Sequence, residues 1–202
     1  MLFRSTERLH ATAVALLERH GLLTREAIRG EGVPGGFAGM YKVLKAMEEA
    51  GRVRRGYFVA GMGGAQFAVP GAVDRLRAFR EPPPRPDVCV LAATDPANAY
   101  GVALPWPVKG PQRAAGAYVV LVDGLPSLYL EKGGRSLVAL RPFDDSWEDV
   151  VLDTVAGMVG ADDEGRGVRF RRLVLERVPD ELVPRLRARG FVATPKGMAK
   201  YP

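Results

Sequence analysis

The sequence lacks the residue patterns that define several large classes of protein. One cysteine, Cys89, occurs among 202 residues, so no intrachain disulfide can form and a reducing cytoplasm is the expected compartment. Cys89 lies in the apolar run Val88–Leu91, which predicts a buried structural thiol. No apolar run reaches the roughly 18 residues that cross a membrane, and the N-terminus lacks the apolar core of a signal peptide. The sequence therefore predicts a soluble, intracellular protein with no membrane partner.

Residues for metal, nucleotide or nucleophilic chemistry are scarce as well. The two histidines, His10 and His20, fall in one predicted helix without a cysteine or carboxylate pattern around them, which argues against a zinc site. No Gly-Lys dipeptide is present, so the phosphate-binding loop of an ATPase is missing, and a G-x-S-x-G sequence is absent too. We expect no cofactor and no metal, and recognise no catalytic site.

Acidic residues gather at three places, where a structural role competes with a chemical one. A predicted helix over residues 144–158 carries four acids on its outer face, which is typical of a solvated surface: Asp145, Glu148, Asp149 and Asp153. The run Asp162–Glu164 lacks the alternate-position spacing of a calcium loop and is interpreted as a turn. Asp95, Asn98 and Tyr100 follow a predicted strand, where sites often lie, but such residues also form ordinary turns, and we favour the turn.

Positive charge is concentrated in the first part of the chain. Residues 1–80 contain 13 Lys and Arg against 7 Asp and Glu, whereas residues 81–202 contain 16 of each sign. Residues 81–87 include four prolines and predict a stiff linker, because proline lacks a backbone donor and has a fixed φ. We therefore predict two domains, residues 1–80 and 88–202. The first is the candidate nucleic-acid binder, since basic side chains that displace counterions supply non-specific affinity.

Residues 36–70 predict a helix followed by a β-hairpin. The apolar stripe of the helix, at i, i+3, i+4, i+7 spacing, consists of Met40, Val43, Leu44 and Met47. Gly51 ends the helix. From Arg52 the side-chain pattern changes to a period of about two, which predicts a strand. The glycines at 61–64 form a hairpin tip, and the strand Gln66–Val69 returns antiparallel. A first helix is predicted at residues 5–20. A second begins after Thr24, its cap, and runs to about residue 29. Together with the later helix and hairpin they give the order of a winged helix-turn-helix. A closing helix follows at 71–80.

The side of this helix and hairpin that the core does not use is rich in basic residues. The outward positions on the helix are Ala38, Tyr41, Lys42 and Lys45. The hairpin adds Arg52, Arg54, Arg55, Gly63 and Gly64. Lysines beside small or flat residues suit a phosphate backbone, arginines on a hairpin suit the edge of a groove, and glycines let the tip approach closely. We favour nucleic-acid contact over the alternative, a solvated basic face.

The second domain predicts an antiparallel meander with added helices. Strands are expected at residues 88–93, 117–122, 127–131, 136–140 and 169–178. Asp123-Gly124 and Lys132-Gly133-Gly134 are the predicted hairpin turns, and a short helix at 179–189 leads to a final extended segment. The fold class is therefore α+β, an N-terminal winged helix-turn-helix followed by a small antiparallel β-barrel-like domain with helices.

Four blocks of sequence together resemble the C-terminal extension of large helicase-related proteins, the Lhr family. They are Gly35-Gly36-Phe37-Ala38-Gly39, the basic run Arg52 to Val59, Gly63-Gly64-Ala65-Gln66-Phe67-Ala68, and Ala93-Thr94-Asp95-Pro96-Ala97-Asn98. In that family an ATP-dependent core translocates 3′-to-5′ on single-stranded DNA and unwinds duplexes, including RNA:DNA hybrids. The resemblance implies that this chain is the last winged helix of such a tail plus its terminal β-barrel module.

The resemblance leaves three functions open. The leading one is a non-catalytic DNA-binding module of a DNA-repair helicase, whose partners are single-stranded or duplex DNA, an RNA:DNA hybrid, and the helicase core. The second is part of a DNA glycosylase site, with an acid such as Asp95 activating water, although the Gln-x-Gln or Gln-x-Asp of the related winged-helix glycosylases is absent. The third is a protein-binding or homo-oligomerisation cap.

Overall fold

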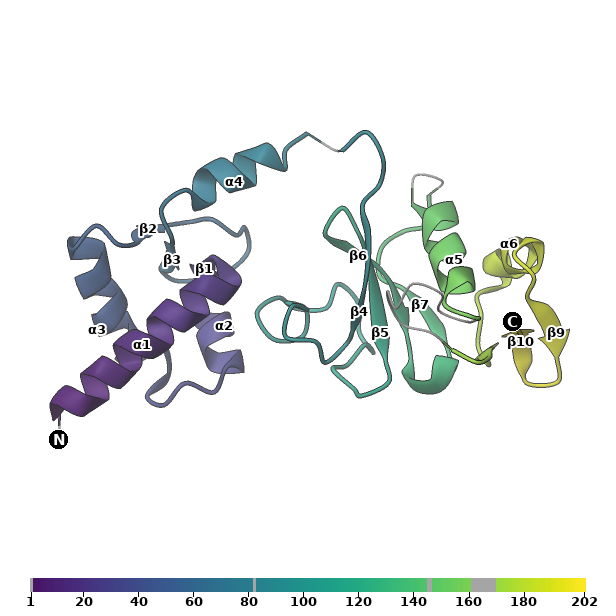
Figure 1. The fold of residues 1–202 in the computed structure, drawn as a ribbon, viewed down its shortest axis with the longest axis horizontal. Helices are drawn as coiled ribbons and strands as arrows, with labels where there is room; N and C mark the ends of the chain where they lie inside the picture. Colours follow the sequence, from purple (N-terminus) through teal and green to yellow (C-terminus); the bar gives the residue numbers. More distant parts are fainter. Residues whose placement is uncertain (1, 82, 145–146, 161–169) are drawn as a thin grey trace. The chain divides into compact units, whose positions relative to one another are not determined.

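The computed structural model describes residues 2–81, 83–144, 147–160 and 170–202 (Figure 1). The chain divides into two compact units, one of Met1–Glu81 with Val102–Pro105 and one of Pro82–Gly101 with Trp106–Pro202. Each unit contains helices and strands, and the described strands pair antiparallel in all three sheets. The α+β class with a winged helix at the N-terminus is confirmed.

The first unit is built from helices around one apolar core. Its helices are α1 (Leu2–His20), α2 (Arg25–Gly30), α3 (Gly36–Glu49) and α4 (Ala72–Ala78). The predicted stripe of α3 is buried against α1 residues such as Leu16 and Leu17. The Thr24 hydroxyl accepts a hydrogen bond from the Ala27 amide at 3.1 Å, so the predicted cap of α2 is confirmed. Helix α1 begins earlier than the predicted start at residue 5.

A small sheet forms the wing. Its strands β1 (Leu22–Leu23), β2 (Arg54–Gly56) and β3 (Gln66–Ala68) lie in the order β1-β3-β2. The sequence did not predict β1, which is two residues long. Strand β2 is shorter than predicted because the amides of Phe58 and Val59 bond to the Gln66 side chain instead of extending the ladder. In α4, Val73, Leu76 and Phe79 are exposed, so the predicted apolar face of this helix is not buried.

The second unit contains a four-stranded meander, as the turn signals predicted. Its strands are β4 (Val88–Ala92), β5 (Tyr118–Val122), β6 (Leu125–Leu130) and β7 (Leu137–Ala139), in the order β4-β5-β6-β7. Asp123 and Gly124 both have positive φ, 53° and 76°, as a tight hairpin turn requires. The short 3₁₀ turn Lys132–Gly134 joins β6 to β7. In the described residues β4 and β7 do not pair, so this sheet is open rather than a closed barrel.

A second small sheet and two helices complete this unit. They are β8 (Leu173–Leu175), β9 (Val192–Thr194), β10 (Gly197–Lys200), α5 (Glu148–Gly157) and α6 (Val183–Ala188), with a 3₁₀ turn at Asp180–Leu182. The strand order is β8-β10-β9. Trp147 is fully buried in a core shared by both sheets and α5. This core covers one face of the meander, and a second buried cluster, which includes Val119, Tyr129 and Leu140, lies on the other face.

Two structural expectations for the second unit are wrong. Cys89 is exposed, because it alternates along β4 with Val88 and Val90, which pack against the core, and so lies on the opposite face of the strand. Glu148 is buried and paired with Arg185, so the acidic face of α5 is not simply solvated. Asp149 and Asp153 of the same face bind the Arg189 guanidinium at 2.7 and 2.6 Å. Asp145 and the acidic turn at 162–164 lie outside the described residues.

We propose residues 81–87 as a linker between independently folding domains. The described residues of this segment are all exposed, and none belongs to a helix or strand. Limited trypsin digestion is expected to cut after Arg80 and leave two fragments that each unfold cooperatively. Resistance to cleavage between Arg80 and Val88, together with a single unfolding transition for the whole chain, would contradict this boundary.

Candidate nucleic-acid interface

The structure separates the predicted basic residues into paired and unpaired ones. Lys45 lies 3.8 Å from Glu49, an exposed pair one helical turn apart. Arg55 Nε lies 3.4 Å from Glu48, and its guanidinium donates to the Tyr41 hydroxyl at 3.1 Å. Within the described residues, no carboxylate lies within 4.0 Å of the cationic groups of Lys42, Arg52 or Arg54, all three of which are exposed. These three are the cations best placed for an external anion.

Tyr41 points less fully outward than the helical spacing predicted. Its ring is half-buried and meets the Phe67 ring edge-on, with ring centres 5.8 Å apart. Strand β2 places Arg55 opposite the buried Phe67, so Arg55 lies over Tyr41 and reaches Glu48 of α3. The tyrosine and the arginine therefore fasten the wing to α3.

Arg54 occupies the other face of β2. It lines a hollow of about 170 Å³ between the wing and α4, together with Phe58, Asp74 and Arg77. Asp74 already accepts a hydrogen bond from Arg77 at 3.1 Å, which leaves Arg54 without a carboxylate partner among the described residues. Two arginines, Arg54 and Arg77, line this hollow with one acid, Asp74, so this side of the wing is electropositive.

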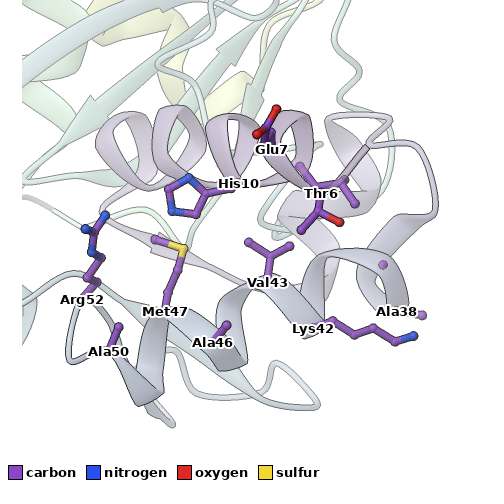
Figure 2. A pocket seen from close by; sticks show the side chains of 12 residues that line it. Thr6, Glu7, His10, Ala38, Lys42, Val43, Ala46, Met47, Ala50 and Arg52 are labelled. Atoms are coloured by element: carbon purple, nitrogen blue, oxygen red, sulfur yellow. The ribbon is translucent and has the colours of Figure 1, made fainter. Parts of the chain in front are cut away.

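A surface groove of about 980 Å³ lies along the seam between the packed helices α1 and α3 (Figure 2). Its floor is mostly apolar, with Leu9, Val43, Met47, Ala46 and Ala50 among the lining residues. Lys42 and Arg52 lie at opposite ends of the groove, and Ala38 lies beside Lys42 (Figure 2). The exposed Ala38 therefore has the predicted position next to a free lysine.

The tip of the wing is held by a buried amide that the sequence analysis did not identify. Gln66 has no exposed surface, and its side-chain oxygen accepts from the amides of Phe58 and Val59, both at 2.8 Å. Its amide nitrogen donates to the carbonyls of Val59 and Met62 at 3.0 and 3.3 Å. The feature of the sequence that could have identified this role is Gln66 itself, one polar residue inside the apolar run Ala65–Val69.

The predicted glycines of the tip have different roles. Gly64 has a φ of +82°, which a residue with a side chain adopts only at a cost, whereas Gly63 does not have a positive φ. An added Cβ at Gly63 would meet no atom within 4 Å. Both glycines are exposed, so the tip leaves space for close approach of a nucleic-acid backbone.

The loop that carries Asp95 and Asn98 is organised by Arg113, another residue that the sequence analysis missed. The Arg113 guanidinium donates to the carbonyls of Asn98, Thr94, Asp95 and Tyr100 at 2.6, 3.1, 3.1 and 3.4 Å. Asp95 accepts from the Ala97 amide at 2.8 Å, and the Asn98 side chain donates to the Ala93 carbonyl at 2.9 Å. Burial raises the pKa of Tyr100. These bonds support the turn-forming role for this loop.

The described part of the chain contains no cluster of three or more metal-binding side chains. Of its helices, none combines the length and the apolar content needed to cross a membrane. His20 is hydrogen-bonded to Glu31 at 3.0 Å, which gives one of the two histidines a structural partner.

The chain is similar to proteins of one known family. A family model described as "Large helicase-related protein, winged-helix domain" matches residues 3–88. A protein of Escherichia coli, "Lhr helicase/uracil glycosylase", is 36% identical over 203 residues, which cover 96% of this chain and 13% of that protein. The chain belongs to the Lhr family.

A second Lhr relative supports the assignment. The "Lhr helicase/ probable uracil glycosylase" of Mycolicibacterium smegmatis is 57% identical over 143 residues, which cover 67% of this chain and 10% of that protein. The resemblance to Lhr proteins that the winged-helix blocks indicated is thereby confirmed. The chain spans about an eighth or less of the length of these two relatives.

Proposed function

We propose that this chain is a DNA-binding module of an Lhr-type helicase, and that it binds through the wing and the outer side of α3. The observation that carries the proposal is the set of three exposed cations without a carboxylate partner in the described residues, Lys42, Arg52 and Arg54. Of the five cations predicted on this surface, Lys45 and Arg55 pair with acids, whereas these three have no carboxylate partner among the described residues and stay available to an external anion.

The proposed contact is to the phosphate backbone rather than to base edges. Lys42 and Arg52 flank the α1–α3 groove, and Arg54 lies beside α4, so the charges are spread along the surface. Sequence readout requires side chains arranged to hydrogen-bond the edge of one particular base, and these three cations do not form such an arrangement. Base sequence is therefore expected to matter little. The helicase core of a longer Lhr protein is the proposed partner that would supply ATP-driven movement.

Binding across a salt series tests this function. If about three cations contact phosphates, the logarithm of affinity should fall with the logarithm of salt concentration with a slope of roughly −2 to −3. Labelled single-stranded DNA, duplex DNA and RNA:DNA hybrids of equal length distinguish the preferred strand state. An absence of binding to all three at low salt would contradict the proposal and leave a protein-binding role.

A second candidate function is part of a DNA glycosylase site. It is favoured by the names of both relatives, which include uracil glycosylase. The position of Asp95 argues against its being the catalytic acid, because its carboxylate accepts from the Ala97 amide within a turn. Asp95→Ala is therefore expected to leave any uracil release by this chain unchanged. Release by the wild-type chain that is lost in a folded Asp95→Ala variant would establish Asp95 as catalytic.

A further inference from the structure

Tyr57 is an exposed aromatic side chain with no ring partner among the described residues. It is 89% exposed, although it follows directly after strand β2. In the described part of the chain, the rings of Tyr41, Tyr100, Tyr118 and Tyr129 each have another ring centre 5.6 to 6.0 Å away, whereas the ring of Tyr57 has none. Tyrosine is enriched at binding interfaces, because its ring offers a large apolar contact area while its hydroxyl can stay hydrated.

The exposure of Tyr57 is built into the wing rather than caused by a loose loop. The next two backbone amides, of Phe58 and Val59, are bound by the buried Gln66 side chain. Phe58 folds back over Gly56, where an added Cβ would lie 3.2 Å from its ring, so Phe58 takes the inward position. The backbone on both sides of Tyr57 is therefore fixed, and binding through its ring would require little ordering of the loop.

Free cations lie close to Tyr57 in the chain. Arg54 precedes it by three residues on β2, Arg52 precedes it by five, and neither has a carboxylate partner among the described residues. An exposed ring that follows such arginines within a few residues of the chain is a combination used to bind single-stranded nucleic acid, because bases stack on the ring while phosphates meet the cations. Paired bases inside a duplex do not offer a face for such stacking.

We propose that Tyr57 stacks on an unpaired base and gives the wing a preference for single-stranded nucleic acid. This inference rests on the proposed nucleic-acid function and adds the strand state that the wing recognises. Arg54 holds the phosphate next to the stacked base. The stacking contributes to affinity without reading the sequence, because every base has a π-face.

The test compares Tyr57→Ala and Tyr57→Phe with Phe79→Ala, which removes another ring, 82% exposed, from the same unit. The probes are a labelled oligothymidylate and an oligonucleotide of the same length made of abasic residues, at fixed salt. Tyr57→Ala should weaken binding of oligothymidylate by about tenfold, the order expected for loss of one base–aromatic stack. Its binding to the abasic strand should be unchanged. Tyr57→Phe and Phe79→Ala should bind both strands as the wild type does.

The outcomes separate this inference from the function on which it rests. Salt-dependent binding by the wild type, with equal affinity of Tyr57→Ala for oligothymidylate, overturns the stacking role and leaves phosphate binding intact. Equal weakening of Tyr57→Ala for both strands also overturns stacking, because the effect would then be one on the backbone contacts. A wild-type chain that binds neither strand overturns both proposals.

Discussion

Replacing Lys42, Arg52 and Arg54 together by alanine is expected to weaken DNA binding on the order of 100-fold at 0.15 M salt and to remove most of the salt dependence. Each cation that meets a phosphate releases counterions, so its loss should reduce the slope of the salt plot by nearly one unit. Fluorescence anisotropy with a labelled oligonucleotide across a salt series measures both quantities. Because the three side chains are exposed and unpaired in the described structure, the fold should be preserved.

The matched control replaces the two paired cations, Lys45 and Arg55, by alanine. Arg55 is occupied by Glu48 and the Tyr41 hydroxyl, and Lys45 pairs with Glu49, so removing them should change the salt slope little. Arg54 and Arg55 thus form the sharpest pair of single variants, adjacent in sequence but on opposite faces of β2. A larger effect of Arg55→Ala than of Arg54→Ala, in folded proteins, would show that the binding face is not the one proposed.

Replacing Arg113 by leucine should destabilise the second unit by roughly 3 kcal/mol or more, because several carbonyls in one loop lose their charged donor at once. The guanidinium bonds to the carbonyls of residues 94, 95, 98 and 100 at distances from 2.6 to 3.4 Å. Leucine keeps much of the apolar volume but donates no hydrogen bond. Urea denaturation followed by tryptophan fluorescence reports this unit, since Trp106 stacks on Tyr100 at the end of the loop.

Arg172→Leu is the control for this change, because Arg172 is an exposed arginine of the same unit with no hydrogen bond or ion pair in the described structure. This variant should change the free energy of unfolding by an amount typical of surface substitutions, within about 0.5 kcal/mol. Equal stability of Arg113→Leu and Arg172→Leu would mean that the loop does not depend on the guanidinium, and the turn role assigned to Asp95 would lose its structural support.

Local signals in the sequence predicted most helices and turns correctly. The stripe of α3, the Thr24 cap and the Asp123-Gly124 hairpin each depend on residues within about seven positions of one another, so the interactions that decide them are visible in a short window. The ends of β2 and the exposure of Cys89 could not be predicted in this way. They depend on the Gln66 side chain and on which face of β4 the rest of the unit covers.

The winged-helix order, the concentration of positive charge in residues 1–80 and the family resemblance can all be read from the chain alone. Which basic residues lack a carboxylate partner among the described residues depends on folding, because Arg54 and Arg55 look alike in the chain and differ in the α3 residues they can reach. Folding also decides that Tyr57 is uncovered while Tyr41 is packed, and that Arg113 holds a loop more than ten residues away in the chain. A charge or a ring has its chemistry from its residue type, but its availability depends on neighbours that folding brings together from distant positions.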